Sequence, residues 1–374
     1  MQTGFDVPAE IGMAEAEIAT PALIVDLDAF EANLATMRRR AESLGVALRA
    51  HAKTHKSADI ALAQMARGGA VGVCVQKASE ALALARAGVG DILVANEVRG
   101  ARRAAMLAEA AKIARIAVCI DDPTAVAALS AAALSAGVEL GALVELEAGG
   151  GRCGAEPGAP AVEIARAILA APGLCFEGIQ CYCGPAQHIY EPAARRARID
   201  AAIAQARATR DALLEAGLPC PKVTGAGTGS FEFEGASGVY SELQCGSYVF
   251  MDADYARVRD DAGAPPPFAH SLFVLAEVMS ASRPGRAICD AGLKVMSFDS
   301  GLPRVHGLDG VEYLGASDEH GALADPDGRL KIGDRLRLIP GHCDPTCNLH
   351  DWYVAVRGGK VEALWPVTAR GKHF

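Results

Sequence analysis

The chain has 374 residues, of which 51% are hydrophobic, and a formal net charge of −9. A chain of this length can form one large domain and a smaller second one. The acidic charge excludes nucleic acid and anionic membrane surfaces as main partners, because both would repel the protein. A small-molecule enzyme fits these properties better.

The cysteines and the N-terminus indicate the compartment. Eleven cysteines, an odd number, are scattered from Cys74 to Cys347, which is typical of cytosolic thiols and not of a disulfide framework. Residues 1–17 contain neither the basic nor the apolar stretch of a secretory signal, and no apolar run reaches membrane-spanning length. We therefore predict a cytoplasmic protein that does not bind membranes.

From about residue 22, short β-branched runs alternate with longer alanine-rich segments of helical periodicity, the pattern of repeated β-α units around a parallel sheet. About eight such units closing on themselves predict a TIM-type (β/α)8 barrel. An open, doubly wound sheet is the alternative, because sequence pattern alone does not close a barrel. The predicted strands are 22–27, 46–52, 70–75, 91–96, 115–120, 141–147, 175–182, 221–227 and 241–250, and the clearest predicted helices are 29–45, 57–69, 77–88 and 191–217.

After about residue 262 the pattern changes to short alternating strands with Gly and Pro turns and no convincing helix. We therefore predict an α/β barrel over residues 26–262 and a C-terminal antiparallel β domain over residues 263–374, joined at the proline-rich segment APPPF. We expect residues 1–25 to form an N-terminal segment that packs with the β domain. The strand at 22–27 could belong to either sheet.

The active site of a barrel of this kind forms at the C-terminal ends of its strands. Lys53 lies at such an end, in the segment HAKTHK with His51, His55 and Lys56. A lysine among other positive groups would have a lowered pKa and could act as a nucleophile. Taken alone, a solvated basic turn is the simpler interpretation.

Two stretches of small residues follow the last two predicted barrel strands. TGAGTGS, residues 224–230, can expose backbone N–H groups that cradle a phosphate, although it matches neither the P-loop nor GxGxxG. QCGSY, residues 244–248, could close on the same anion. Phosphate sites at the last two strands of a barrel are frequent.

Three further polar residues lie beyond predicted strands. Arg152 could face a phenolate or a carboxylate, or merely pair with Glu145 or Glu147. Tyr182 and His188 follow another strand, and each also has an ordinary loop interpretation. A lysine, a phosphate cradle, an arginine and a tyrosine at the ends of different barrel strands together indicate a pyridoxal phosphate site.

The segment GHCDPTCNLHDW is rich in potential metal ligands. On an extended segment, the i, i+2 spacing of His342 and Asp344 would point both side chains to one face. An imidazole and a carboxylate suit Mg, Mn or Zn, with open positions for water or substrate. A structural zinc on Cys343, Cys347 and His350 is the rival interpretation, but no second CxxC completes it, and a vicinal redox pair is a third.

Six motifs, in this order and over nearly the whole chain, resemble a known family. They are HAKTHK, GGGRCG, IQCYCGPAQH, TGAGTGS, LQCGSY and GHCDPTC, and the family is that of the D-threonine aldolases and D-serine dehydratases. Its members are alanine-racemase-like, fold-type III pyridoxal enzymes with a barrel and a β domain, and they act on D-amino acids. Many relatives have proline where this chain has Ala50, a difference that concerns strand geometry more than chemistry.

The resemblance implies roles for particular residues. Lys53 would bind pyridoxal 5′-phosphate covalently, and Arg152 would face the cofactor. His342 and Asp344 would bind a divalent metal that grips the β-hydroxyl of the substrate. The dehydratases have Cys at the position of Asp344, and an oxygen ligand favours Mg or Mn and hence an aldolase. The other cofactor-binding residues implied are Tyr182, Thr224, Gly227, Thr228, Gly246, Ser247 and Tyr248.

The resemblance also implies an activity, supported by the stretches MDADY, SFDSGLP and SDEHG. A homodimer would cleave a 3-hydroxyamino acid, 3-hydroxy-D-aspartate, reversibly to glycine and glyoxylate. His188, or a hydroxide on the metal, would remove the β-hydroxyl proton. The alternatives are a D-threonine aldolase of broad specificity, a D-3-hydroxyaspartate or D-serine dehydratase, and a pyridoxal phosphate carrier without activity. Candidate partners for the second substrate carboxylate are Lys294, His320 and Arg283.

Overall fold

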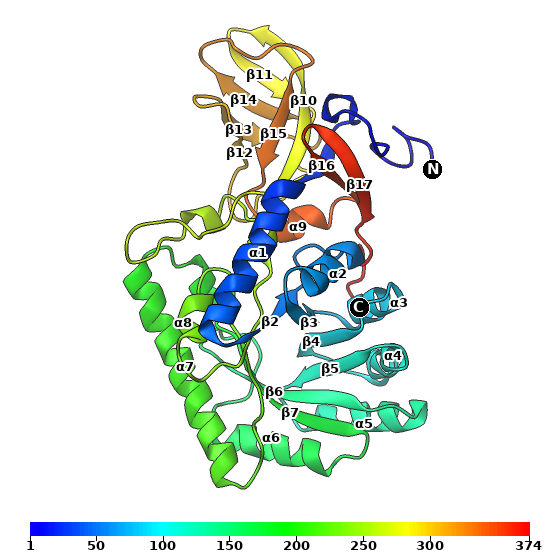
Figure 1. The fold of residues 1–374 in the computed structure, drawn as a ribbon, viewed down its shortest axis with the longest axis vertical. Coiled ribbons are helices and arrows are strands. Elements are labelled where there is room, and N and C mark those ends of the chain that lie inside the picture. The colour runs from blue at the N-terminus through cyan, green and yellow to red at the C-terminus, as the bar shows by residue number, and fades with distance from the viewer.

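A computed structural model describes all residues 1–374 and contains two sheets (Figure 1). Eight parallel strands, β2 to β9, close into a barrel. The barrel strands are β2 (Ala47–His51), β3 (Ala70–Val75), β4 (Asp91–Glu97), β5 (Arg115–Ile120), β6 (Leu140–Leu146), β7 (Leu174–Cys181), β8 (Val223–Gly225) and β9 (Glu242–Leu243). The predicted TIM-type barrel is confirmed, and the open sheet is wrong.

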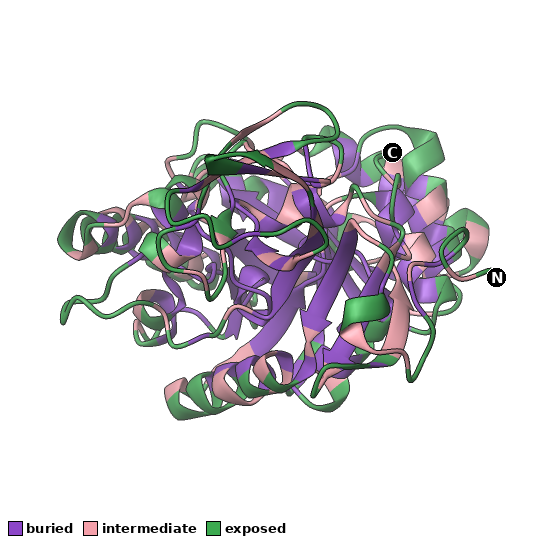
Figure 2. Ribbon diagram, turned by 90° about the horizontal axis from the view of Figure 1, so that it is seen from above, coloured by how far each residue is buried: buried purple, intermediate pink, exposed green.

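Helices surround the barrel, with their inner sides buried and their outer sides exposed (Figure 2). The first of them begins where Asp26 accepts the backbone N–H of Ala29, and it ends at Gly45, whose φ of 69° few other residues adopt. The helices are α1 (Leu27–Leu44), α2 (Ala58–Ala66), α3 (Ala78–Arg86), α4 (Ala101–Ala111), α5 (Thr124–Ala136), α6 (Ala159–Ala170), α7 (Pro192–Glu215) and α8 (Phe231–Gly235).

The barrel strands are covered on both faces, by helices outside and by packed side chains inside. All seven residues of β6 are buried, including Glu145. Such strands are apolar nearly throughout, because neither face meets water. A carboxyl group within this run is therefore exceptional and indicates a function at the inner face of the barrel.

The second sheet is mostly antiparallel, with the strand order β13-β14-β11-β10-β1-β16-β17 and with β15 paired to β10 and β12. The strand predicted at 22–27 belongs to this sheet, as β1, between β10 and β16. Its strands are β1 (Ala22–Asp26), β10 (Leu272–Arg283), β11 (Gly285–Cys289), β12 (Arg304–Val305), β13 (Glu312–Ala316), β14 (Gly321–Asp325), β15 (Arg335–Ile339), β16 (Trp352–Arg357) and β17 (Lys360–Pro366).

Both ends of the chain are tied down by backbone hydrogen bonds. Near the N-terminus, the Gly12 N–H donates to the Val361 carbonyl of β17 at 2.8 Å. The last residues return to the barrel, where the Ala369 N–H donates to the Lys56 carbonyl at 2.8 Å. The domain limits at residues 25 and 262 stay predictions. None of the helices combines the length and apolarity needed to cross a membrane.

One prediction about the β domain is wrong. The segment CDPTC forms a short helix, α9 (Cys343–Cys347), where an extended segment was expected. Two polar side chains stabilise it. Asp252 accepts the Cys343 N–H at 2.9 Å, and the Thr346 hydroxyl donates to the carbonyl of His342 at 2.8 Å. The helix places Asp344 in its first turn and His342 at its N-cap. The two side chains therefore do not share one face of a strand, as the sequence had suggested.

Candidate active site

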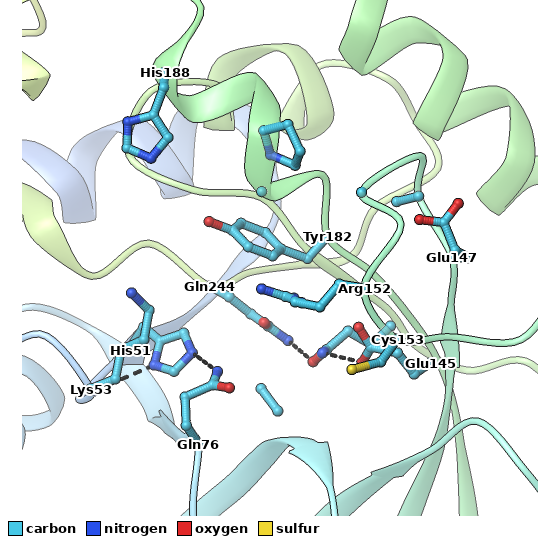
Figure 3. A pocket seen from close by; sticks show the side chains of 16 residues that line it. His51, Lys53, Gln76, Glu145, Glu147, Arg152, Cys153, Tyr182, His188 and Gln244 are labelled. Atoms are coloured by element: carbon cyan, nitrogen blue, oxygen red, sulfur yellow. Dashed lines mark hydrogen bonds between the residues drawn. The ribbon is translucent and has the colours of Figure 1, made fainter. Parts of the chain in front are cut away.

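A cavity of about 450 Å³ lies beyond the carboxyl ends of the barrel strands (Figure 3). Four of the residues singled out from the sequence line it. Lys53 follows β2, Arg152 follows β6, Tyr182 follows β7, and His188 ends the 3-10 turn η2 (Gly184–His188). These four side chains therefore meet at the carboxyl ends of the strands, where the active site of such a barrel is expected.

Lys53 makes an ion pair with the β domain. Its Nζ lies 2.5 Å from Oδ2 of Asp344. Burial alone would lower the pKa of Lys53, but the Asp344 carboxylate raises it above its ordinary value. Burial alone would raise the pKa of the Asp344 carboxyl, but the charge and hydrogen bond of Lys53, with further contributions from His342 and Thr54, together lower that pKa below its ordinary value.

The predicted lowering of the Lys53 pKa is therefore wrong for the protein without bound ligands. The expectation depended on positive charge from His51, His55 and Lys56, and the Lys56 ammonium group is paired with Glu80 at 3.1 Å. Both His51 and His55 are buried, and burial lowers their pKa values, that of His55 to about 4. They are neutral near pH 7 and contribute no charge, whereas Asp344 contributes a negative one.

Arg152 and Tyr182 lie next to each other within the cavity (Figure 3). The Arg152 guanidinium carbon is 5.9 Å from the centre of the Tyr182 ring. This separation is within the range of a cation–π contact. Burial raises the pKa of the Tyr182 hydroxyl, which therefore stays protonated at neutral pH. The pair offers a cation and a hydrogen-bond donor to a ligand in the cavity.

A buried chain of polar side chains forms one wall of the cavity. Gln180 donates its amide to Glu145, and Gln244 donates to Gln180 Oε1 at 2.7 Å and to Thr224 Oγ1 at 3.0 Å. Burial, followed by the charge of Glu97, raises the pKa of Glu145 to about 8. Sequence analysis missed this wall, because it named Glu145 only as a neighbour of Arg152.

The predicted phosphate residues form two adjoining turns that do not line the cavity itself. Tyr248 donates its backbone N–H to the Thr228 hydroxyl at 3.0 Å, which joins the two turns. The turn after β8 contains Ala226 at a φ of 70°, a left-handed conformation that can aim successive N–H groups at one point. The N–H groups of Gly227 and Gly246 donate to no acceptor within the protein.

Close packing explains the glycines in these turns. A Cβ on Gly227 would lie 2.5 Å from Gln187 Oε1, and one on Gly246 would lie 2.5 Å from Thr54 Oγ1. A Cβ on Gly246 would also lie 2.8 Å from the carbonyl oxygen of His51, two residues before Lys53. The unused N–H donor of Gly246 is thus next to the loop that carries Lys53.

The two predicted metal ligands lie at the start of α9. His342 Nδ1 is 2.7 Å from Asp299 Oδ2, so its Nδ1–H donates to that carboxylate and its Nε2 remains available. A carboxylate behind a histidine is the usual support of a metal-binding imidazole. No three His, Cys, Asp or Glu side chains are grouped closely enough to hold a metal by themselves.

The rival structural zinc is not assembled. Cys343 and Cys347 are buried in the β domain, and burial raises the pKa values of both thiols. His350 Nε2 instead lies 2.8 Å from the carbonyl oxygen of Val295. These three side chains do not form a metal cluster.

His188 is held by a residue that sequence analysis did not select. Its Nδ1 lies 2.8 Å from Oδ2 of Asp254, and the hydrogen bond with Asp254 is the main reason that the pKa of His188 is raised. Tyr190 donates its hydroxyl to Oδ1 of the same carboxylate at 2.5 Å. The motif MDADY, which contains Asp254, was the available signal.

Comparisons with known proteins agree with this arrangement. Residues 25–254 match the model of the alanine racemase N-terminal domain, and residues 271–356 match that of a serine dehydratase domain. The chain is 53% identical to 3-hydroxy-D-aspartate aldolase of Paracoccus denitrificans (strain Pd 1222), over 100% of this chain and 97% of the relative. This chain belongs to the D-threonine aldolase and D-serine dehydratase family.

Other relatives support the same placement. D-threonine aldolase of an Arthrobacter species is 45% identical over 97% of this chain and 96% of the relative. The crystal structure of D-threonine aldolase from Filomicrobium marinum is 49% identical and superposes with a TM-score of 0.96, covering 98% of this chain and all of that one. The relatives are named aldolases or, at lower identity, dehydratases.

The residues present fit the cofactor of this fold-type III family, pyridoxal phosphate. A lysine amine at a strand end can link to its aldehyde, and the unused backbone N–H groups of Gly227 and of Gly246, the latter next to the lysine loop, can receive its phosphate. A divalent metal also fits, because Nε2 of His342 and the carboxylate of Asp344 leave open positions for water and substrate.

Proposed function

We propose that this protein is a pyridoxal phosphate- and divalent-metal-dependent aldolase that cleaves 3-hydroxy-D-aspartate to glycine and glyoxylate. The observation that carries the proposal is the 2.5 Å contact between Lys53 and Asp344. It brings the candidate metal carboxylate of the β domain into contact with the barrel lysine that lines the cavity. Two relatives that are 53% and 50% identical to this chain bear the corresponding name.

Each residue of the site has a role in this proposal. Lys53 would provide the amine that holds the cofactor. Arg152 and Tyr182 orient the cofactor, and the turns at Thr224, Gly227 and Thr228 and at Gly246, Ser247 and Tyr248 hold its phosphate. When bound, pyridoxal phosphate supplies the electron sink that allows the Cα–Cβ bond to break.

Proton transfer at the β-hydroxyl is assigned to His188. The imidazole lines the cavity and can accept a proton at Nε2, because Nδ1 is bound to Asp254. A divalent metal, Mg or Mn, when held by His342 and Asp344, supplies a Lewis acid next to the same hydroxyl. Loss of the hydroxyl proton and cleavage of the Cα–Cβ bond release the aldehyde, and glycine follows after its α-carbon is protonated.

None of the three candidate partners of the second carboxylate lines the cavity. Lys294 is exposed and paired with Glu319, at 2.6 Å. Arg283 ends β10, and His320 lies in the loop before β14. The cations that do line the cavity are Lys53, Arg152 and, when protonated, His188.

Two other activities remain as alternatives. A D-threonine aldolase of broad specificity would use the same residues on a substrate without the second carboxylate. A dehydratase would expel the hydroxyl group and leave an oxoacid and ammonia. Asp344 favours an aldolase, because an oxygen ligand prefers Mg or Mn to Zn. A carrier protein would have no use for the metal pair.

A product assay tests the proposal. Purified protein with pyridoxal phosphate and Mg is given D-3-hydroxyaspartate, and glycine plus glyoxylate are measured against oxaloacetate plus ammonia. Glycine and glyoxylate are the expected products, with a higher kcat/KM than for D-threonine. Oxaloacetate and ammonia would overturn the proposal in favour of the dehydratase. A higher kcat/KM for D-threonine would assign the broader aldolase.

We also propose that the protein is a cytoplasmic homodimer that acts without nucleic acid or membrane partners. All eleven cysteines are unpaired in the structure, which supports a reducing compartment. Light scattering on the purified holoenzyme measures the oligomeric state directly. A mass of one chain would contradict the homodimer.

A further inference from the structure

The pairing of His188 with Asp254 has a geometry that indicates a task beyond structural support. Only 5% of the Asp254 side chain is exposed, against 52% of the His188 side chain. The buried carboxylate uses one oxygen for His188 and the other for the Tyr190 hydroxyl. The His188 ring reaches from this anchor into the cavity, toward Tyr182 and Lys53 (Figure 3).

The hydrogen bond decides which nitrogen of His188 can react. An ionised carboxylate only accepts hydrogen bonds, so Nδ1 of His188 carries the proton. In the neutral imidazole, Nε2 then has the free lone pair. Two hydrogen bonds lower the pKa of Asp254 against the effect of its burial, which keeps the carboxylate ionised. The atom of His188 that can accept a proton is therefore the one that Asp254 does not hold.

The segment that carries Asp254 is bonded to the segment that carries the candidate metal ligands. The Ala253 and Asp254 N–H groups donate to the carbonyl groups of Pro340 and Gly341, at 3.0 and 3.2 Å. These two residues directly precede His342. The Asp254 segment therefore fixes the position of His188 relative to the start of α9, although the two lie in different parts of the chain.

We propose that Asp254 is a positioning residue that acts through His188, setting its tautomer and aiming Nε2 at the β-hydroxyl of the substrate. This inference rests on the proposed function, because the β-hydroxyl of the proposed substrate supplies the proton that His188 accepts. The proton passes from the hydroxyl oxygen to Nε2, and the electron pair of the O–H bond stays on that oxygen. The Nδ1 proton remains on Nδ1, and the Asp254 carboxylate stabilises the positive charge that the ring acquires.

Several charged groups surround His188. Asp254 raises the pKa of His188 most, and burial opposes this effect. The negative charges of Asp252 and Asp299 raise the same pKa further, by smaller amounts. The Arg257 guanidinium lies 3.7 Å from Oδ1 of Asp254. The Tyr255 ring packs 6.4 Å from the His188 ring, between centres. The Asp254→Asn variant removes the largest of these contributions and leaves the others in place.

The first test is a histidine NMR titration of the holoenzyme, with His188 assigned by the loss of its signal in His188→Asn. We expect Asp254→Asn to lower the pKa of His188 and to change its tautomer. The matched control is Asp261→Asn, because this exposed carboxylate pairs with Arg196 at 3.0 Å and does not contact His188. An unchanged His188 titration in Asp254→Asn would overturn the proposal, even if no substrate is ever cleaved.

The second test uses kinetics. Because His188 accepts a proton only when neutral, kcat should rise with pH through the His188 pKa, and Asp254→Asn should move this rise to lower pH. At the plateau we expect kcat to fall about 100-fold with little change in KM. Combining Asp254→Asn with His188→Asn should cost no more than His188→Asn alone, because one residue acts through the other.

Further results distinguish a positioning role of Asp254 from a purely structural one. Additive losses in the double variant, with an unmoved pH profile, would make Asp254 a structural residue and overturn the inference. Tyr190→Phe, which removes only the hydrogen bond to Oδ1, should give a smaller loss in the same direction. A wild-type protein that cleaves no hydroxyamino acid would contradict the proposed function, while the NMR result would still decide the relation between Asp254 and His188.

Discussion

The amine of Lys53 and the carboxylate of Asp344 lie 2.5 Å apart, although 291 residues separate them in the sequence. In the holoenzyme that we propose, Lys53 is linked to the cofactor and no longer offers Asp344 a free ammonium group. Asp344 can then bind a metal. The barrel and the β domain therefore share a carboxylate whose partner depends on whether the cofactor is present.

We predict from this relationship that the cofactor and the metal bind cooperatively. Removal of pyridoxal phosphate should weaken Mn binding about tenfold, because Asp344 must first leave Lys53. Titration of Mn into holoenzyme and cofactor-free protein, followed by electron paramagnetic resonance, measures the two affinities. Equal affinities would show that the ion pair does not compete with the metal.

Replacing Lys53 by Ala should abolish the visible absorbance of the bound cofactor and lower kcat/KM by at least about 1,000-fold. The reason is that no other lysine lines the cavity. Absorbance spectra and the product assay check both effects. Lys294→Ala is the matched control, because 64% of the Lys294 side chain is exposed on the β domain. A surviving band with activity would mean that the cofactor lysine is another residue.

The Asp344→Cys variant tests whether the carboxylate of Asp344 favours aldol cleavage over dehydration. A thiolate is a softer ligand than a carboxylate, so we expect activation by Mg and Mn to be lost and Zn to bind more tightly. Metal titrations with product analysis measure this change. Asp351→Cys controls for the added thiol, because 68% of the Asp351 side chain is exposed. Unchanged metal preference and unchanged cleavage would remove the argument from Asp344.

The free energy of unfolding should fall as the pH rises from the ordinary pKa of Glu234, which applies to the unfolded state, to its raised pKa in the folded protein. This carboxyl in α8 is 2% exposed, and burial raises its pKa to about 7. Below pH 4.5 the folded and unfolded states are both protonated. Above it the unfolded state ionises first, and the folded state loses stability until about pH 7. The Glu234→Gln variant, which cannot ionise, should therefore gain about 3 kcal/mol over the wild type between pH 4.5 and 8.

Urea unfolding at several pH values measures this difference between Glu234→Gln and the wild type. The control is Glu232→Gln in the same helix, because 48% of the Glu232 side chain is exposed and its salt bridge with Arg40 is screened by water. The control should show no such trend with pH. A constant difference between Glu234→Gln and the wild type at all pH values would show that folding does not raise the pKa of Glu234.

Much of the fold follows from local patterns in the sequence. The alternation of β-branched runs and alanine-rich helices predicts the barrel, because each unit is short and its period is clear. The helix α9 could not be predicted in the same way. It has five residues, and Asp252, which is 91 residues away, accepts the N–H of Cys343. A stabilising contact over that distance leaves no periodic pattern to detect.

The candidate site was predictable to the same extent. The position of Lys53, Arg152, Tyr182 and His188 after strands placed them at one cavity. Which charges meet there was not predictable, because this depends on burial and on contacts between distant segments. The partner of Lys53 comes from α9. Similarly, the anchor of His188 comes from a segment 66 residues later in the chain.

The position of β1 has a consequence for biosynthesis. This strand, only 22 residues from the N-terminus, pairs with β10 on one side and with β16 on the other. It leaves the ribosome before the barrel strands, yet both of its neighbours are translated only after the whole barrel. Until then its backbone donors and acceptors have no strand to pair with, and its apolar side chains are exposed. The nascent chain must therefore keep β1 from pairing with other proteins until β10 and β16 have been synthesised.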